Sequence, residues 1–349
     1  MPAPNSERAL PLAVTMGDPA GIGPEIVLKS YLRRADRGLP PFALYGCPRT
    51  LADRAKMMGL EIAIREISAP TEALQIVSAQ LPVLPIPVAR DAKPGHPLPE
   101  NAMGTISAIE QAVRAVVAGE ASAIVTAPIA KAVLYAAGFV HPGHTEFLAA
   151  LAGSLVPGKR HHPVMMLASD LLRVVPVTIH IPVSDVPRAL SKRLLYETIN
   201  ISWRSLKSEF GIDEPRIAVT GLNPHAGEGG TIGREDIDLI APAIEELRRE
   251  GLSVSGPYSA DTLFHAAARK TYDAAVCMYH DQALIPIKTL SFDTGVNVTL
   301  GLPFVRTSPD HGTAFDIAAK GIASPESMLA AIRMAGEFAD RRRVRMAAE

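Results

Sequence analysis

The chain has 349 residues, of which 48% are hydrophobic but only 5% aromatic, and its formal net charge is −1. This length suffices for two domains, and the Ala-, Val-, Ile- and Leu-rich composition favours alternating strands and helices over an all-β sandwich. Interspersed, balanced charges exclude a broad field for nucleic acid or an anionic membrane. The two cysteines exclude a disulfide scaffold, and neither the polar first ten residues nor any later apolar run predicts a targeting segment or a membrane span. We therefore expect a soluble, cytoplasmic α/β protein.

Strand and helix signals alternate along the chain. Apolar, β-prone runs predict strands at residues 12–16, 42–45, 122–126, 164–168, 172–178, 217–220 and 274–279. Apolar spacing and glycine stops predict a helix from the turn at 17–26 toward residue 34, others at 50–59, 101–118, 128–137, 144–152, 187–210 and 235–250, and a C-terminal helical pair. The prolines between 82 and 99 predict an extended arm or edge hairpin.

This order predicts a mainly parallel, doubly wound sheet with right-handed crossovers. We expect a first α/β domain at residues 10–140 plus 305–349, and a second at 141–304.

Three histidines each follow a predicted strand. His180 follows residues 172–178, His225 follows the strand at 217–220 and Gly221-Leu-Asn-Pro, and His280 directly follows 274–279. Strand ends are where α/β proteins keep their chemistry. Three converging neutral imidazoles can hold one divalent metal and leave positions open for a substrate. Because a lone histidine at a strand end is usually satisfied by backbone or water, the predicted metal site rests on the recurrence of the pattern.

Two glycine-rich segments also follow predicted strands. Residues 17–23 lack the third glycine of G-x-G-x-x-G, so they are either a tight structural turn or a place where backbone amides approach a ligand. Residues 221–233 embed Asn223, His225 and Glu228 among glycines and lead into a helix N-terminus. Such a loop can bind an anion, which we favour over a flexible connection.

Basic and amide side chains gather in the last third of the chain. Lys288, Asn297 and Arg306 lie near glycines or prolines, and together they suit a substrate that carries phosphate and carboxylate groups, whereas each alone is as compatible with a solvated surface. His144 and Thr145 begin a predicted helix after Pro142-Gly143, where they either cap that helix or face an anion.

The motifs, taken in order, resemble those of the 4-hydroxythreonine-4-phosphate dehydrogenase family of pyridoxal phosphate biosynthesis. The resemblance covers most of the chain. It is carried by Met16-Gly-Asp-Pro-Ala-Gly-Ile-Gly-Pro-Glu25, Thr126-Ala-Pro-Ile-Ala-Lys131, Gly143-His-Thr-Glu146, Gly221-Leu-Asn-Pro-His-Ala-Gly-Glu228, Ala260-Asp-Thr-Leu-Phe264, Met278-Tyr-His-Asp-Gln282, Asn297-Val-Thr-Leu-Gly-Leu-Pro-Phe304 and Arg306-Thr-Ser-Pro-Asp-His-Gly-Thr313.

The resemblance implies a fold similar to that of the isocitrate and isopropylmalate dehydrogenases, with two α/β domains flanking a cleft that holds the active site. It implies that His180, His225 and His280 bind the metal at a homodimer interface and that Asp261 lies near the substrate. It also implies substrate contacts from His144, Thr145, Lys288, Asn297 and Arg306. Lys288 and Asp261 are the expected catalytic residues.

The implied cofactors are NAD, or NADP, beside the glycine-rich and C-terminal loops, and one divalent metal such as zinc, magnesium or cobalt. The expected reaction oxidises the C3 hydroxyl of 4-phosphohydroxy-L-threonine, and β-decarboxylation then gives 3-amino-2-oxopropyl phosphate and carbon dioxide.

Three alternatives stay open. Paralogues that resemble this chain oxidise four-carbon sugar-acid phosphates (threonate or erythronate 4-phosphate) or an aromatic cis-dihydrodiol carboxylate. A metal-dependent phosphohydrolase could use the same histidines and anion loop, although it would normally need more carboxylate ligands or a second metal. A phosphometabolite sensor would need no metal.

Overall fold

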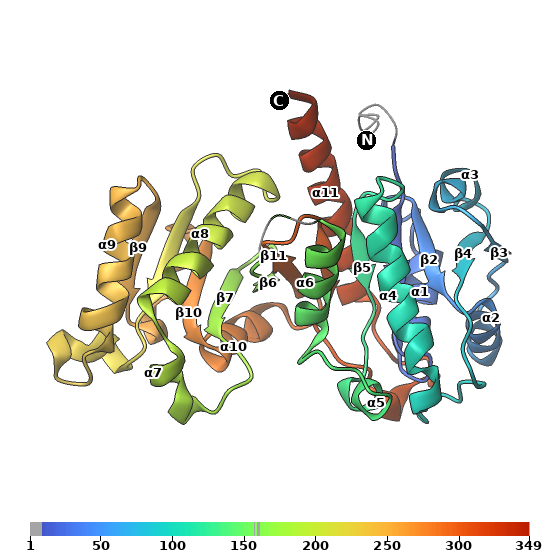
Figure 1. Ribbon diagram of the computed structural model, residues 1–349, viewed down its shortest axis with the longest axis horizontal. Coiled ribbons are helices and arrows are strands. Elements are labelled where there is room, and N and C mark those ends of the chain that lie inside the picture. The colour runs from blue at the N-terminus through green and yellow to red at the C-terminus, as the bar shows by residue number, and fades with distance from the viewer. Residues whose placement is uncertain (1–8, 157, 159–160, 349) are drawn as a thin grey trace. The chain divides into compact units, whose positions relative to one another are not determined.

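The computed structural model describes residues 9–156, 158 and 161–348, which form two compact units (Figure 1). Unit 1 comprises the chain up to Pro163 together with the chain from Leu302 onward, and unit 2 is the continuous segment Val164–Gly301. Each unit has α/β architecture, which confirms the predicted fold class. In the described part of the chain, no helix combines the length and the apolar character needed to cross a membrane.

The sheet of unit 1 is parallel throughout its described pairings. Its strands run in the order β3 (Ile64–Glu66), β4 (Leu81–Pro85), β2 (Phe42–Gly46), β1 (Leu12–Thr15), β5 (Ile124–Thr126) and β12 (Arg306–Pro309). All residues of β1 and β2 are buried, as expected where helices cover both faces of a parallel sheet.

Helices lie on both faces of this sheet. They are α1 (Gly23–Leu32), α2 (Pro48–Met57), α3 (Ala73–Ile76), α4 (Ala102–Val117), α5 (Lys131–Ala136), α6 (His144–Leu155) and α11 (Glu326–Ala348). Ile124 belongs to the core that α4 and α6 share. The next residue of β5, Val125, pairs with Thr307, whose hydroxyl donates to the carbonyl of Ala331 in α11. Because neighbouring strand residues face opposite ways, α11 lies on the other face.

The sheet of unit 2 is mixed. Its order is β11 (Val296–Leu300), β6 (Val164–Ala168), β7 (Arg173–Thr178), β10 (Ala274–Tyr279), β8 (Arg216–Thr220) and β9 (Ser253–Tyr258), in which β11, β6 and β7 pair antiparallel and the others parallel. The helices are α7 (Val186–Ala189), α8 (Lys192–Ser208), α9 (Ala241–Arg249) and α10 (His280–Ser291). Ser191 caps α8 by accepting a hydrogen bond from the amide of Leu194, 3.1 Å away.

The proline-rich stretch differs from its prediction, because part of it is an internal strand. β4 lies between β3 and β2 rather than in a projecting arm or an edge hairpin. The amide of Leu81 bonds the carbonyl of Ala63, and the carbonyl of Val83 accepts from Ile67, so the odd-numbered residues of β4 pair toward β3. The proline at position 85 would also face β3, but it has no N–H to donate. No ladder hydrogen bond is lost, because β3 has already ended at Glu66.

Other strands give weak sequence signals. The pattern did not predict β3, β9, β11 or β12, which are short or interrupted by Gly256 and Pro257. The domain boundaries also differ from those predicted. Phe147 and Leu148 of α6, and Leu302 and Phe304, are buried in the core of unit 1, although residues 141–304 were expected to form the second domain.

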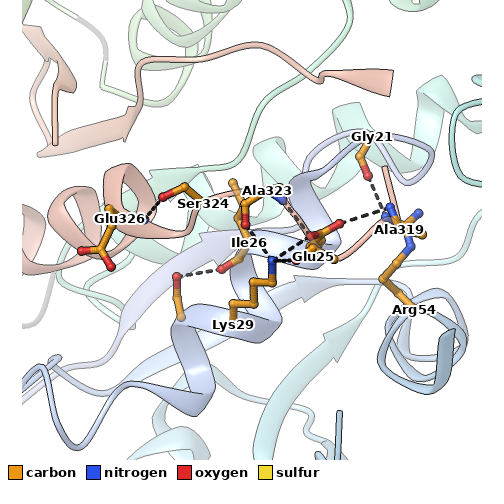
Figure 2. A network of polar contacts seen from close by, with 11 residues as sticks. Gly21, Glu25, Ile26, Lys29, Arg54, Ala319, Ala323, Ser324 and Glu326 are labelled. Atoms are coloured by element: carbon orange, nitrogen blue, oxygen red, sulfur yellow. Dashed lines mark hydrogen bonds and ion pairs between the residues drawn. The ribbon is translucent and has the colours of Figure 1, made fainter. Parts of the chain in front are cut away.

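A buried carboxylate ties α1 to the C-terminal part of unit 1 (Figure 2). Glu25 is 0% exposed and accepts hydrogen bonds from Lys29 Nζ at 2.8 Å and from the amides of Ala319 and Ala323 at 3.1 Å each. Lys29 Nζ also donates to the carbonyls of Gly321 and Ala323. This network fixes residues 319–323 against α1.

The turn at residues 17–23 is tightly packed within unit 1. Arg54 of α2, 2% exposed, donates to the carbonyl of Gly21 at 2.8 Å (Figure 2). It also donates to the carbonyl of Pro19 at 3.2 Å. Gly17 has φ +76°, and a Cβ there would lie 2.4 Å from the carbonyl oxygen of Pro128. The structure thus explains this glycine by backbone conformation and close packing.

Candidate active site

In unit 1, Arg306 brings two sequence-distant segments together. Its guanidinium is buried, and Nε and Nη2 donate to Thr126 Oγ1 at 3.2 and 2.7 Å. Nη2 also lies 3.3 Å from Nδ1 of His144. β12 positions Arg306 and β5 ends at Thr126, so the pair forms where two adjacent parallel strands lie in register. Thr126 has no role predicted from the sequence, although it ends a predicted strand and begins one of the family motifs.

His144 is held in one charge state and one tautomer. Burial, followed by the positive charges of Arg306 and Lys131, keeps the pKa of His144 well below its ordinary value of 6.5. Because a guanidinium only donates, Nδ1 must accept from it, and the ring proton then lies on Nε2. Nε2 is buried and has no hydrogen-bond partner among the described residues. This N–H is a donor that an acceptor on a ligand would satisfy.

The same corner of unit 1 is positively charged. Burial lowers the pKa of Arg306 to about 9, so its guanidinium still carries charge at neutral pH. Thr145 is the second residue of α6, whose N-terminus directs backbone amides outward from the residues after Gly143. A buried cation, a neutral imidazole N–H and a helix N-terminus are suited to an anionic ligand group.

In unit 2, the histidines at positions 180 and 280 are neighbours. β7 and β10 are parallel, Thr178 pairs with Tyr279, and the two histidine rings lie 5.7 Å apart between centroids. His280 Nδ1 lies 2.7 Å from Asp281 Oδ1. A carboxylate on one ring nitrogen orients an imidazole and leaves Nε2 for a metal, so the donor chemistry here suits a divalent ion.

His225 lies in a different local setting, a turn of left-handed backbone. Residues 225–230 all have positive φ, including the non-glycine residues His225 (+53°), Ala226 (+51°) and Glu228 (+42°). Each such residue costs about 1–2 kcal/mol relative to a right-handed conformation. The imidazole contributes to the lowered pKa of Asp261, which arises mainly from the hydrogen bond that Ser259 donates to that carboxylate.

The remaining predicted residues lie on separate elements of unit 2. Lys288 is on α10, and its Nζ lies 5.9 Å from the ring centroid of Phe292. Asn297 is in β11, and its Oδ1 is buried without a hydrogen-bond partner in the described structure. Within one chain the described residues include no group of three or more His, Cys, Asp or Glu side chains placed to hold a metal. The structure therefore brings the His180 and His280 rings together, whereas His225 is linked to Asp261 only by a minor electrostatic effect.

Two residues without a predicted role, Gln282 and Asp236, order these strand ends. Gln282 Oε1 accepts from Thr220 Oγ1 and from the amide of Met278, both at 2.7 Å, and its Nε2 donates to the carbonyl of Gly221 at 2.8 Å. This side chain joins the ends of β8 and β10. Asp236 plays a similar part for the loop that carries His225, and only its place at the predicted start of a helix could have indicated it.

The comparisons with known proteins agree with the motifs. The family described as "Pyridoxal phosphate biosynthetic protein PdxA" matches residues 39–335. A 4-hydroxythreonine-4-phosphate dehydrogenase of Methylorubrum populi is 54% identical over 334 residues, 95% of each chain, and one of Bradyrhizobium diazoefficiens is 53% identical over 342 residues, 96% of this chain and 98% of the other.

Solved structures show the same likeness. A crystal structure of 4-hydroxythreonine-4-phosphate dehydrogenase from Klebsiella pneumoniae is 38% identical, with a TM-score of 0.82 over 95% of this chain and 98% of that one. A terephthalate 1,2-cis-dihydrodiol dehydrogenase from Burkholderia xenovorans is 28% identical, with a TM-score of 0.63 over 95% and 98%.

Fold and relatives together define an α/β dehydrogenase. More narrowly, the chain belongs to the PdxA family of pyridoxal phosphate biosynthetic proteins, which confirms the resemblance found in the motifs.

Proposed function

We propose that the chain oxidises 4-phosphohydroxy-L-threonine at its C3 hydroxyl, with β-decarboxylation of the resulting β-keto acid to 3-amino-2-oxopropyl phosphate and carbon dioxide. The observation that supports this most is the buried Arg306–Thr126–His144 group with its unpartnered Nε2–H, because it suits a substrate with an anionic end. The dehydrogenase relatives favour this reaction over phosphate hydrolysis.

The residues of the chain have separable tasks in this proposal. Arg306, His144 and Thr145 bind and orient an anionic group of the substrate, and Asn297 and Lys288 contact its polar groups. Asp261, whose pKa lies below its ordinary value, stays ionised at neutral pH and accepts a hydrogen bond. Lys288 donates a proton to the carbon that carbon dioxide leaves.

His180, His225 and His280 are the proposed ligands of a divalent ion such as zinc, magnesium or cobalt, in a homodimer whose second copy completes the site. When bound, such a metal would supply Lewis-acid polarisation of the hydroxyl, and NAD or NADP would supply a hydride acceptor. We also propose a cytoplasmic location, as for other enzymes of small soluble metabolites.

The test is NADH formation by the purified protein with 4-phosphohydroxy-L-threonine, before and after chelation and with metal restored. We expect metal-dependent reduction with release of carbon dioxide. His225→Ala should lose more than about 100-fold in turnover while keeping its fold. The control is His265→Ala, at an exposed position, and it should keep the turnover of the parent. Undiminished turnover of His225→Ala would contradict the metal site. If NAD is reduced only with threonate 4-phosphate, erythronate 4-phosphate or a dihydrodiol carboxylate, the substrate is that of a paralogous dehydrogenase and not 4-phosphohydroxy-L-threonine.

A further inference from the structure

The left-handed turn that carries His225 needs support from outside itself. Six successive residues, 225–230, have positive φ, and three of them are not glycine. Non-glycine residues persist in this conformation only where surrounding contacts enforce it. The His225 side chain is exposed and does not hold the turn in place. The support must therefore come from contacts that other residues make with the backbone on either side of His225.

One carboxylate supplies that support. Asp236 is 1% exposed, and its Oδ1 accepts from the amide of Leu222 at 2.8 Å. Its Oδ2 accepts from the amide of Asn223 at 3.2 Å and from Asn223 Nδ2 at 3.0 Å. The three donors lie in the two residues that precede Pro224 and His225, so the carboxylate fixes the entry to the turn.

The same carboxylate also abuts the turn itself. A Cβ on Gly221 would lie 2.5 Å from Asp236 Oδ1, and a Cβ on Gly227 would lie 3.2 Å from Oδ2. The carboxylate therefore fits between the entry and the middle of the left-handed turn. Asp236 is itself fixed, because it begins a π-helical segment, Asp236–Ile240, that leads into α9. Such π segments are frequent at functional sites.

We propose that Asp236 is a positioning residue that holds the left-handed turn so that the His225 imidazole is presented to a divalent metal. This inference rests on the proposed function, since it concerns the same metal site. Asp236 acts through the backbone of residues 221–227 and needs no contact with the metal or with the imidazole.

The experiment is a Co²⁺ titration of the metal-free, full-length protein, followed by visible absorption and by calorimetry. Asp236→Asn keeps the shape of the side chain but replaces an acceptor with a donor that faces amide N–H groups. We expect it to bind Co²⁺ about 10- to 100-fold more weakly. Asp238→Asn is the matched control, because this carboxylate lies in the same π segment but pairs with the exposed Arg234. Its Co²⁺ affinity should equal that of the parent.

A purely structural role would lower the melting temperature of Asp236→Asn without changing the Co²⁺ affinity of its folded form, and that result would overturn the inference. If Asp236→Asn does not fold, Asn223→Ala is the second variant. It removes the side-chain hydrogen bond to Asp236 and the one that Asn223 Nδ2 donates to Glu235 Oε2, 2.8 Å away, and it should still weaken Co²⁺ binding. Unchanged affinity in this variant overturns the inference.

His225→Ala separates the two proposals. If it loses Co²⁺ binding while Asp236→Asn keeps it, the metal site stands and the positioning role fails. If the parent and His225→Ala bind equally, both fail.

Discussion

The His144 ring combines a buried N–H with a low affinity for protons. Its Nδ1 faces a guanidinium, and its Nε2 has no described partner. Burial disfavours the charged ring, and protonation would also place a second positive charge beside Arg306. The ring therefore stays neutral at physiological pH and serves as a hydrogen-bond donor rather than a cation.

This arrangement predicts acid sensitivity. Between the low folded-state pKa of His144 and the ordinary value of 6.5, the unfolded chain binds a proton that the folded chain does not. The contribution of His144 to stability is therefore present above about pH 6.5 and is lost as pH falls, by at most about 1.4 kcal/mol per pH unit. His144→Gln should lose less stability than the parent between about pH 7 and pH 5 in urea unfolding.

The exposed His265→Gln is the control, and it should keep the parent's pH dependence. An unaltered acid sensitivity in His144→Gln would show that other groups cause the effect.

At the scale of elements, the link between α1 and residues 319–323 depends on one carboxylate. Glu25→Ala leaves Lys29 and two amides without their shared acceptor. We therefore expect the free energy of unfolding to fall by about 3–5 kcal/mol. Glu326→Ala is the comparison, because Glu326 pairs with Arg33 and Arg37, whose side chains are 48% and 51% exposed. That loss should stay within about 1 kcal/mol. Equal losses in calorimetry would refute a special role for Glu25.

A second comparison concerns the turn after β1. Gly17 and Gly119 have similar φ values, +76° and +73°, but only Gly17 has a backbone carbonyl in the path of a Cβ. Gly119→Ala should lower the free energy of unfolding by about 1–2 kcal/mol, because alanine disfavours the left-handed backbone conformation. Gly17→Ala should lower the free energy of unfolding by about 3–5 kcal/mol, because the turn must also move to relieve the clash with the carbonyl of Pro128. Thermal unfolding of the two variants tests this difference.

For the whole molecule, local patterns predicted the elements better than their arrangement. Buried strands such as β1 and β10, and the amphipathic helix α4, follow directly from apolar runs and spacing. The short strand β12 has no such run, yet it carries Arg306. The motifs were sufficient to predict the family, since they occur in order along most of the chain.

The pairings within the site were beyond sequence reasoning. Arg306 and Thr126 are 180 residues apart, and no periodicity encodes a contact at that separation. The left-handed turn was equally hidden, because Ala226 and Glu228 are residues that normally avoid positive φ. Its cause is the buried carboxylate of Asp236, a tertiary contact.

The interrupted course of unit 1 has a consequence for protein synthesis. All of unit 2 is translated between β5 and β12. At about 5–20 residues per second, the ribosome therefore adds Arg306 roughly 9–36 s after Thr126. During this interval the β12 side of β5 lacks its partner, whereas Val164–Gly301 is already a continuous folding unit. The anion-binding corner thus forms late, and nascent chains that stop short of β12 expose an unpaired strand edge that chaperones and proteases can recognise.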